Sequence, residues 1–271
     1  MRLTHILAGA AACAVALSMA AIVPASASAA ATTANYAALG DSYSSGVGTD
    51  DYYSNSGSCD RSPESYAALW AAAHSVSNFD FAACSGAKTT DVLSGQLGGL
   101  SASTNLITMN IGGNDAGFSS VMTTCIEDTV FGDSGCLNAV STAETFVRNS
   151  LPGLLDTLYA KIKSDAPNAK VIIVGYPDFY QVPGTCSVGL SDTERTAIDG
   201  GADLLDSTIN TEVGKYGFTF DDVRSAFSAH EICSSSAWIN SVDWTNITES
   251  YHPTANGYAD ADLPSLDAIT G

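Results

Sequence analysis

Several features are scarce in the 271-residue chain, and each absence excludes a class of protein. Basic residues are few: ten Lys and Arg stand against 29 Asp and Glu, for a formal net charge of −19. A chain this acidic is a poor ligand for nucleic acid or for an anionic surface. It contains no C-x-x-C pair and no glycine-rich phosphate loop. We therefore predict no metal site and no organic cofactor.

Long apolar runs are also missing, except near the N-terminus. Residues 6–23 are rich in Ala, Leu and Val, and the small residues that follow offer cleavage sites after Ala27 and Ala29. This pattern is typical of a secretory signal peptide, and a retained anchor is disfavoured because no stop-transfer charges follow. We predict that residues 1–29 are a signal peptide. We expect residues 30–271, which no linker divides, to form a single domain of an extracellular monomer.

The cysteine content agrees with export. Loss of the signal peptide would remove Cys13 and leave six cysteines, an even number that predicts disulfides in a secreted chain. Six cysteines allow 15 pairings, and spacing alone does not choose among them. The six are Cys59, Cys84, Cys125, Cys136, Cys186 and Cys233.

Strand and helix patterns alternate along the rest of the chain. Apolar runs predict strands over residues 35–39, 79–83, 106–111, 170–175 and 217–220. Helices are expected from Ser62 through Trp70, roughly over 142–164, from a capping box at Ser191–Glu194, and from Pro253 onward. The run at 170–175 is almost continuously apolar, as in a strand covered on both faces. The alternation predicts an α/β fold: a three-layer α/β/α sandwich around a parallel sheet.

Three of the predicted strands end in small or amide residues. Ser42 closes Gly-Asp-Ser, Gly86 closes Cys-Ser-Gly, and Asn114 lies in Gly-Gly-Asn-Asp. Open α/β sheets place their reactive groups at such strand ends. Acyl transfer requires a nucleophile and preorganised donors for an oxyanion. We expect Ser42 to be the nucleophile, with the Ser42 and Gly86 N–H groups and the Asn114 amide as donors.

A serine nucleophile requires a base, and the chain has four histidines. His5 lies in the predicted signal peptide, His74 on a predicted helix, and His230 beside a predicted disulfide. His252 has a carboxylate three residues earlier, at Glu249, and a proline directly after it. We therefore predict that Ser42, His252 and Glu249 act as a triad.

Gly-Asp-Ser at Ser42, Cys-Ser-Gly at Gly86, Gly-Gly-Asn-Asp at Asn114 and His252-Pro253 form four blocks in this order along the chain. Together they resemble the motifs of the GDSL or SGNH hydrolases, and most of all those of the secreted actinobacterial esterases, lipases and phospholipases of that group. The resemblance covers nearly all of residues 30–271. It implies a flavodoxin-like α/β/α sandwich, Ser42 as nucleophile, His252 as general base, and an oxyanion hole formed by Ser42, Gly86 and Asn114. It also implies an ester or lipid substrate and no cofactor. Related secreted members pair six cysteines sequentially, which here gives Cys59–Cys84, Cys125–Cys136 and Cys186–Cys233.

Two positions depart from the family pattern. Tyr43 stands where the motif name has leucine, and Glu249 stands where the D-x-x-H pattern has aspartate. Some relatives orient the histidine with a main-chain carbonyl instead, and the Ser250 carbonyl is the equivalent candidate here.

Other motifs in the chain bear on alternative functions. Gly132-Asp133-Ser134-Gly135 imitates a chymotrypsin-like protease signature, but those proteases are all-β barrels. No G-x-S-x-G elbow surrounds Ser42, which disfavours the α/β-hydrolase fold. A carbohydrate acetyl esterase and a non-catalytic secreted binding protein on the same scaffold remain alternatives. Three loop aromatics, Tyr52, Tyr53 and Phe118, are candidates to line an acyl pocket, but acyl length and head group are not determined by the sequence.

Overall fold

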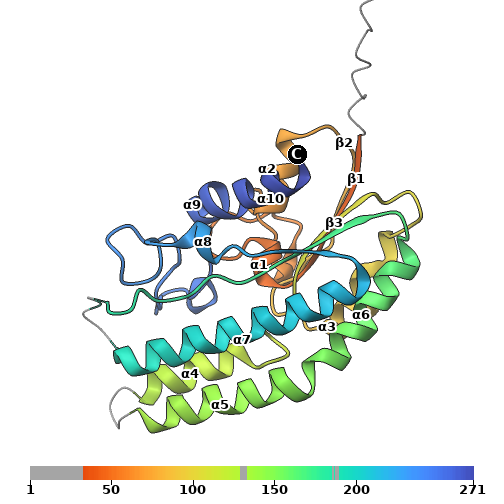
Figure 1. Ribbon diagram of the computed structural model, residues 1–271. Coiled ribbons are helices and arrows are strands. Elements are labelled where there is room, and N and C mark those ends of the chain that lie inside the picture. The colour runs from red at the N-terminus through yellow and green to blue at the C-terminus, as the bar shows by residue number, and fades with distance from the viewer. Residues whose placement is uncertain (1–32, 129–132, 185, 187–188) are drawn as a thin grey trace, which may run out of the picture. The chain divides into compact units, whose positions relative to one another are not determined.

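The computed structural model describes residues 33–128, 133–184, 186 and 189–271. The predicted signal peptide, residues 1–29, lies outside the described residues. From Thr33 onward the chain forms one unit, drawn in Figure 1.

The centre of this unit is a sheet of five parallel strands in the order β2-β1-β3-β4-β5. All five predicted strands are present, with shifted ends; β2, for example, begins three residues before its predicted start. The strands are β1 Ala34–Gly40, β2 Val76–Phe81, β3 Leu106–Asn110, β4 Lys170–Val174 and β5 Thr219–Asp221. This is the flavodoxin-like order, in which the chain changes direction across the sheet between β1 and β3. Ligands of such sheets bind beyond the carboxyl ends of the strands at that point.

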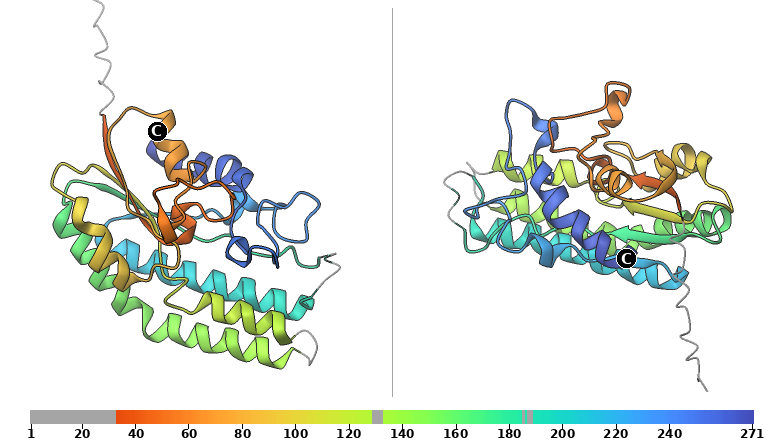
Figure 2. Two further views of the ribbon diagram at one scale, coloured as in Figure 1. Left: turned by 180° about the vertical axis from the view of Figure 1, so that it is seen from behind. Right: turned by 90° about the horizontal axis from the view of Figure 1, so that it is seen from above.

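Helices cover both faces of the sheet, as Figures 1 and 2 show. On one side α5 packs against α4, α6 and α7; on the other, α10 contacts α2 and β5. The helices are α1 Ser42–Ser45, α2 Tyr66–Ala73, α3 Thr89–Asp91, α4 Phe118–Asp128, α5 Ser134–Asn149, α6 Leu151–Asp165, α7 Asp192–Tyr216, α8 Arg224–Phe227, α9 Ala255–Gly257 and α10 Leu263–Thr270. Burial from both sides explains why every residue of β3 is buried. The predicted three-layer α/β/α sandwich is confirmed.

One helix begins where the sequence predicts, and another begins later. The capping box that opens α7 is present: Ser191 Oγ accepts from the Glu194 N–H at 3.2 Å, and Glu194 accepts from the Ser191 N–H at 2.8 Å. The helix predicted from Ser62 begins later, because Ser65 provides the cap.

The helix predicted over 142–164 is two helices, α5 and α6, with Ser150 between them. Pro152 lies in the first turn of α6, where its missing N–H costs nothing, whereas a continuous helix would place it in the interior. One further helix, α4, was not predicted from the sequence.

The disulfides pair as the resemblance implied. Cys59–Cys84, Cys125–Cys136 and Cys186–Cys233 are all formed. Ser134, the serine of the protease-like motif, starts α5 in an α/β fold, which excludes a chymotrypsin-like barrel. Within the described ranges, no helix has both the length and the apolarity needed to cross a membrane.

Candidate active site

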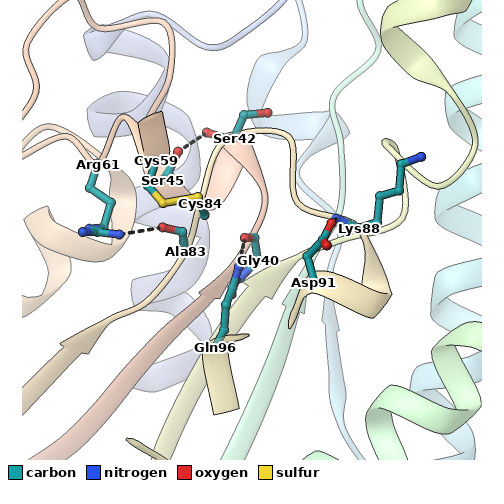
Figure 3. The surroundings of a disulfide bond; sticks show 10 residues. All are labelled: Gly40, Ser42, Ser45, Cys59, Arg61, Ala83, Cys84, Lys88, Asp91 and Gln96. Carbon is teal, nitrogen blue, oxygen red and sulfur yellow. Dashed lines mark hydrogen bonds between the residues drawn. A yellow bond between two sulfur atoms is a disulfide. The ribbon is translucent and has the colours of Figure 1, made fainter. Parts of the chain in front are cut away.

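A sharp turn after β1 presents Ser42. Gly40 has φ +117°, and a Cβ at this position would lie 2.3 Å from the Asn110 carbonyl oxygen, so only glycine fits. The Gln96 side-chain amide stabilises the turn with two hydrogen bonds to Gly40: it accepts from the Gly40 N–H at 2.7 Å and donates to the Gly40 carbonyl at 2.9 Å (Figure 3). Asp41 then caps α1 by accepting from the Tyr43 N–H at 3.0 Å. Ser42 is therefore the first residue of a helix, where N–H groups lack intrahelical partners.

The histidine predicted as base contacts this serine. His252 Nε2 lies 2.7 Å from Ser42 Oγ, and His252 Nδ1 lies 3.0 Å from the Ser250 carbonyl oxygen. Because a carbonyl oxygen can only accept, Nδ1 carries the proton and Nε2 is left free to accept one. Tyr43, which replaces the leucine of the motif name, donates its hydroxyl to the Tyr251 carbonyl at 2.5 Å. That bond ties α1 to the segment that carries His252.

The surroundings of His252 favour the neutral ring. Burial lowers the pKa of His252 to about 4, and main-chain contacts with residues 248–250 oppose a smaller part of that shift. With a pKa below neutral, the imidazole is uncharged at pH 7 and can act as a base.

The position of Glu249 corrects the predicted triad. Its carboxylate accepts hydrogen bonds from the Tyr52 hydroxyl and, at 3.3 Å, from the Asn246 side-chain amide. The ring of His252 instead contacts the Ser250 carbonyl, which was the stated alternative. The Glu249 carboxylate is therefore bonded to Tyr52 and Asn246 and not to the ring.

The predicted oxyanion donors lie together with the serine and histidine. One groove of about 340 Å³ is lined by Ser42, Gly86, Asn114 and His252. Gly86 has φ +76°, a conformation that favours glycine, although a Cβ there would meet nothing within 4 Å. The Asn114 amide nitrogen donates to the Ala87 carbonyl at 3.2 Å, which keeps it beside Gly86. The structure thus brings together Ser42, His252 and both predicted donor positions.

The Cys59–Cys84 disulfide fixes the chain that leads to Gly86 (Figure 3). The Cys84 N–H donates to the Gly40 carbonyl at 3.0 Å, and the Ser85 N–H donates to the Cys59 carbonyl at 3.0 Å. The loop after β2 is therefore held against the turn that presents Ser42, and the donors are positioned before any substrate binds.

A second, apolar cavity of about 80 Å³ also reaches Ser42 and Asn114. Phe118, one of the three predicted pocket aromatics, lies in its wall and stacks on Phe179. Neither Tyr52 nor Tyr53 lines this cavity or the groove: Tyr52 binds Glu249, and Tyr53 is 42% exposed. Much of the rest of the wall comes from residues of α4, α5 and α7: Val121, Met122, Val140, Ala143, Glu144, Val147, Ile198, Gly201, Ala202 and Leu205.

Sequence reasoning missed a buried pair that supports both loops. The Tyr176 hydroxyl donates to Asp41 at 2.5 Å and accepts from the Gly113 N–H at 3.3 Å. It thereby joins the turn before Ser42 to the loop before Asn114. Burial raises the pKa of Asp41 to about 7, against the hydrogen bond from Tyr176. Tyr176 follows β4 by two residues, so the strand-end argument used for Asn114 would also have found it.

The chain is similar to known lipases and acylhydrolases. Residues 38–259 match the model of the GDSL-like Lipase/Acylhydrolase family. The chain is 54% identical to Lipase 1 of Streptomyces coelicolor over 232 residues, which are 86% of this chain and 85% of that protein. It resembles the crystal structure of phospholipase A1 from Streptomyces albidoflavus NA297, with a TM-score of 0.84 and 51% identity, covering 88% and 99% of the two chains. The extracellular lipase of Streptomyces rimosus gives a TM-score of 0.84 and 47% identity, covering 87% and 99%.

Proposed function

Since the chain belongs to the GDSL-like lipase/acylhydrolase family and is a carboxylic ester hydrolase, we propose that Ser42 and His252 hydrolyse acyl lipid esters through an acyl-enzyme. The substrates would include the sn-1 ester of phospholipids. The names of the relatives, lipase and phospholipase A1, support a lipid ester. So does the apolar cavity at Ser42, because its wall is almost entirely hydrocarbon and suits an acyl chain better than a polar sugar. A longer acyl chain is thus favoured over the alternative of an acetylated carbohydrate.

We further propose that the enzyme is exported as a monomer after cleavage within residues 1–29, leaving a single domain from residue 30. Three disulfides and the extracellular relative from Streptomyces rimosus support export.

The reaction starts with a proton transfer. His252 Nε2 takes the proton of Ser42 Oγ, which attacks the ester carbonyl carbon. The oxyanion that forms accepts hydrogen bonds from the Ser42 and Gly86 N–H groups and from the Asn114 amide. The imidazolium keeps its Nδ1–H bond to the Ser250 carbonyl and passes the Nε2 proton to the leaving alkoxide. A water molecule, deprotonated by His252, then attacks the acyl carbon, and the imidazolium returns the proton to Ser42 Oγ as the acid leaves.

The observation that carries this proposal is the 2.7 Å contact between His252 Nε2 and Ser42 Oγ inside a groove shared with Gly86 and Asn114. Replacing Ser42 with alanine should lower p-nitrophenyl ester turnover by about 10⁴-fold or more. It should also abolish labelling by a fluorophosphonate probe, while the melting temperature changes little.

Ser45→Ala is the matched control, because Ser45 lies in the same short helix and its hydroxyl bonds only the Ser42 carbonyl (Figure 3). That variant should keep its turnover and its labelling. Undiminished turnover in Ser42→Ala would refute the assignment of the nucleophile.

A further inference from the structure

Two large apolar side chains are displayed on one loop beside the site. Trp244 is 72% exposed and Ile247 is 59% exposed, the two highest values for large apolar side chains in the described part of the chain. A folded protein gains nothing by leaving a tryptophan in water, and such residues mark surfaces that meet an apolar or interfacial partner.

The position of the loop connects these side chains to catalysis. Ile247 lines the groove that also contains Ser42 and His252. Trp244 precedes it by three residues, in the chain between α8 and α9 that also carries His252. The exposed apolar surface therefore lies at the mouth of the groove through which a substrate reaches Ser42.

Hydrogen bonds hold the loop in this shape. The Asp243 carboxylate accepts from the Thr245 N–H at 2.8 Å, from the Thr245 hydroxyl at 2.6 Å and from the Asn246 N–H at 3.3 Å. The Asp243 N–H donates to the Ser250 hydroxyl at 2.8 Å. Trp244 is thus carried outward on a turn in which the N–H groups of Asp243, Thr245 and Asn246 are already paired. These three groups can enter an interface without losing hydrogen bonds to water.

Charge indicates which kind of surface would fit. The whole chain has a formal net charge of −19. Near the loop, the Asn246 amide lies 3.5 Å from the carboxylate of Asp50, and both Asp50 and Asp51 are exposed. These acids would repel an anionic layer, whereas a zwitterionic layer carries no net charge.

We propose that the turn of residues 243–247 docks on zwitterionic phospholipid layers, with Trp244 and Ile247 in the headgroup boundary. The mouth of the groove then faces the lipid from which the ester is drawn. This inference rests on the proposed function, since it concerns how a lipid substrate reaches Ser42.

The test separates docking from catalysis by measuring binding without turnover. The full chain carrying Ser42→Ala is sedimented with phosphatidylcholine vesicles. Adding Trp244→Ala or Ile247→Ser should each weaken vesicle binding by about tenfold, as expected for loss of a large apolar contact. Phosphatidylglycerol vesicles should bind more weakly than phosphatidylcholine at low salt. Val182→Ser is the matched control, because Val182 is 39% exposed but lines neither the groove nor the apolar cavity.

A second measurement uses the active protein. Trp244→Ala should lower turnover of phosphatidylcholine vesicles by a much larger factor than turnover of dissolved p-nitrophenyl butyrate. Equal vesicle binding by Trp244→Ala and Val182→Ser, or tighter binding to anionic vesicles, would overturn the docking proposal. Failure of the proposed function would appear separately, as ester turnover that survives Ser42→Ala.

Discussion

The two cavities that meet at Ser42 differ in how they are built. The smaller one, of about 80 Å³, is walled mainly by apolar side chains of α4, α5 and α7, which pack against one another in Figure 1. The larger groove, of about 340 Å³, is lined partly by α4 and otherwise mainly by loop and turn residues, many with hydroxyl groups, such as Ser85 and Thr248. Helix packing fixes the first wall, whereas much of the second is held by disulfides, turns and hydrogen bonds.

This difference matches the two halves of an ester. A tight apolar cavity can discriminate acyl chains, because an occupant that does not fit must displace close-packed side chains. An open groove of mixed polarity accepts alcohols of several shapes, since water can fill the space that they leave. Among the described residues, four line both cavities: Ser42, Asn114 and, at the boundary, Phe118 and Met122. A substitution at a shared residue should therefore affect every substrate, and one in a single wall only some.

The largest effect is expected at a shared residue. Replacing Asn114 with alanine removes an oxyanion donor and should lower kcat by about 10²–10³-fold. Because the carbonyl is common to all esters, butyrate and laurate p-nitrophenyl esters should lose the same factor. Steady-state kinetics on both esters measure this.

Asn168→Ala is the control for Asn114→Ala. The Asn168 side-chain amide donates to the Ala102 carbonyl at 3.1 Å, much as Asn114 donates to Ala87, but Asn168 lines neither cavity. A loss in Asn114→Ala confined to the longer ester would mean that Asn114 shapes the acyl cavity and does not serve the oxyanion.

A smaller and selective effect is expected in the apolar wall. A Cβ at Gly201 would meet only Val140 Cγ1, at 3.6 Å, so α7 can carry a side chain there. Replacing Gly201 with leucine should fill the cavity and lower kcat/KM for the laurate ester by about 10–200-fold, with the butyrate ester nearly unaffected. Competition between the two esters measures the change.

Gly200→Leu is a close control, since Gly200 is exposed on the same helix and a Cβ there would meet nothing within 4 Å. If Gly201→Leu and Gly200→Leu had the same chain-length profile, the acyl chain would not occupy the apolar cavity.

The two cavities also differ in how far sequence could predict them. Ser42, Gly86 and Asn114 could be predicted to lie together because the strands of a parallel sheet all end at one edge, and β1, β2 and β3 are neighbours there. The apolar wall was not foreseen beyond Phe118, because it combines the unpredicted α4 and its neighbour α5 with α7, which lies more than 40 residues further along the chain. Sequence separation says little about such packing.

The error at Glu249 has a local cause. A spacing of three residues within a loop does not fix the direction of a side chain. Residues 247–249 form a single 3₁₀ turn, Ser250 is extended, and Tyr251 has φ +64°. This change of direction presents the Ser250 carbonyl to His252 and leaves the Glu249 carboxylate on Tyr52.

The smallest effect is therefore expected at Glu249. Glutamine keeps an oxygen to accept from Tyr52 and leaves the Ser250 carbonyl on the ring, so Glu249→Gln should change kcat/KM by less than about threefold. In the wild-type protein and in Glu249→Gln alike, activity should be lost as pH falls through about 4. The reason is that the pKa of His252 is lowered to that value, and imidazolium cannot accept the Ser42 proton. The pH dependence of kcat/KM for the butyrate ester measures both. An acidic limb that moved by a full pH unit in Glu249→Gln would show that the carboxylate is coupled to the ring, and the orienting role assigned to the Ser250 carbonyl would then fail.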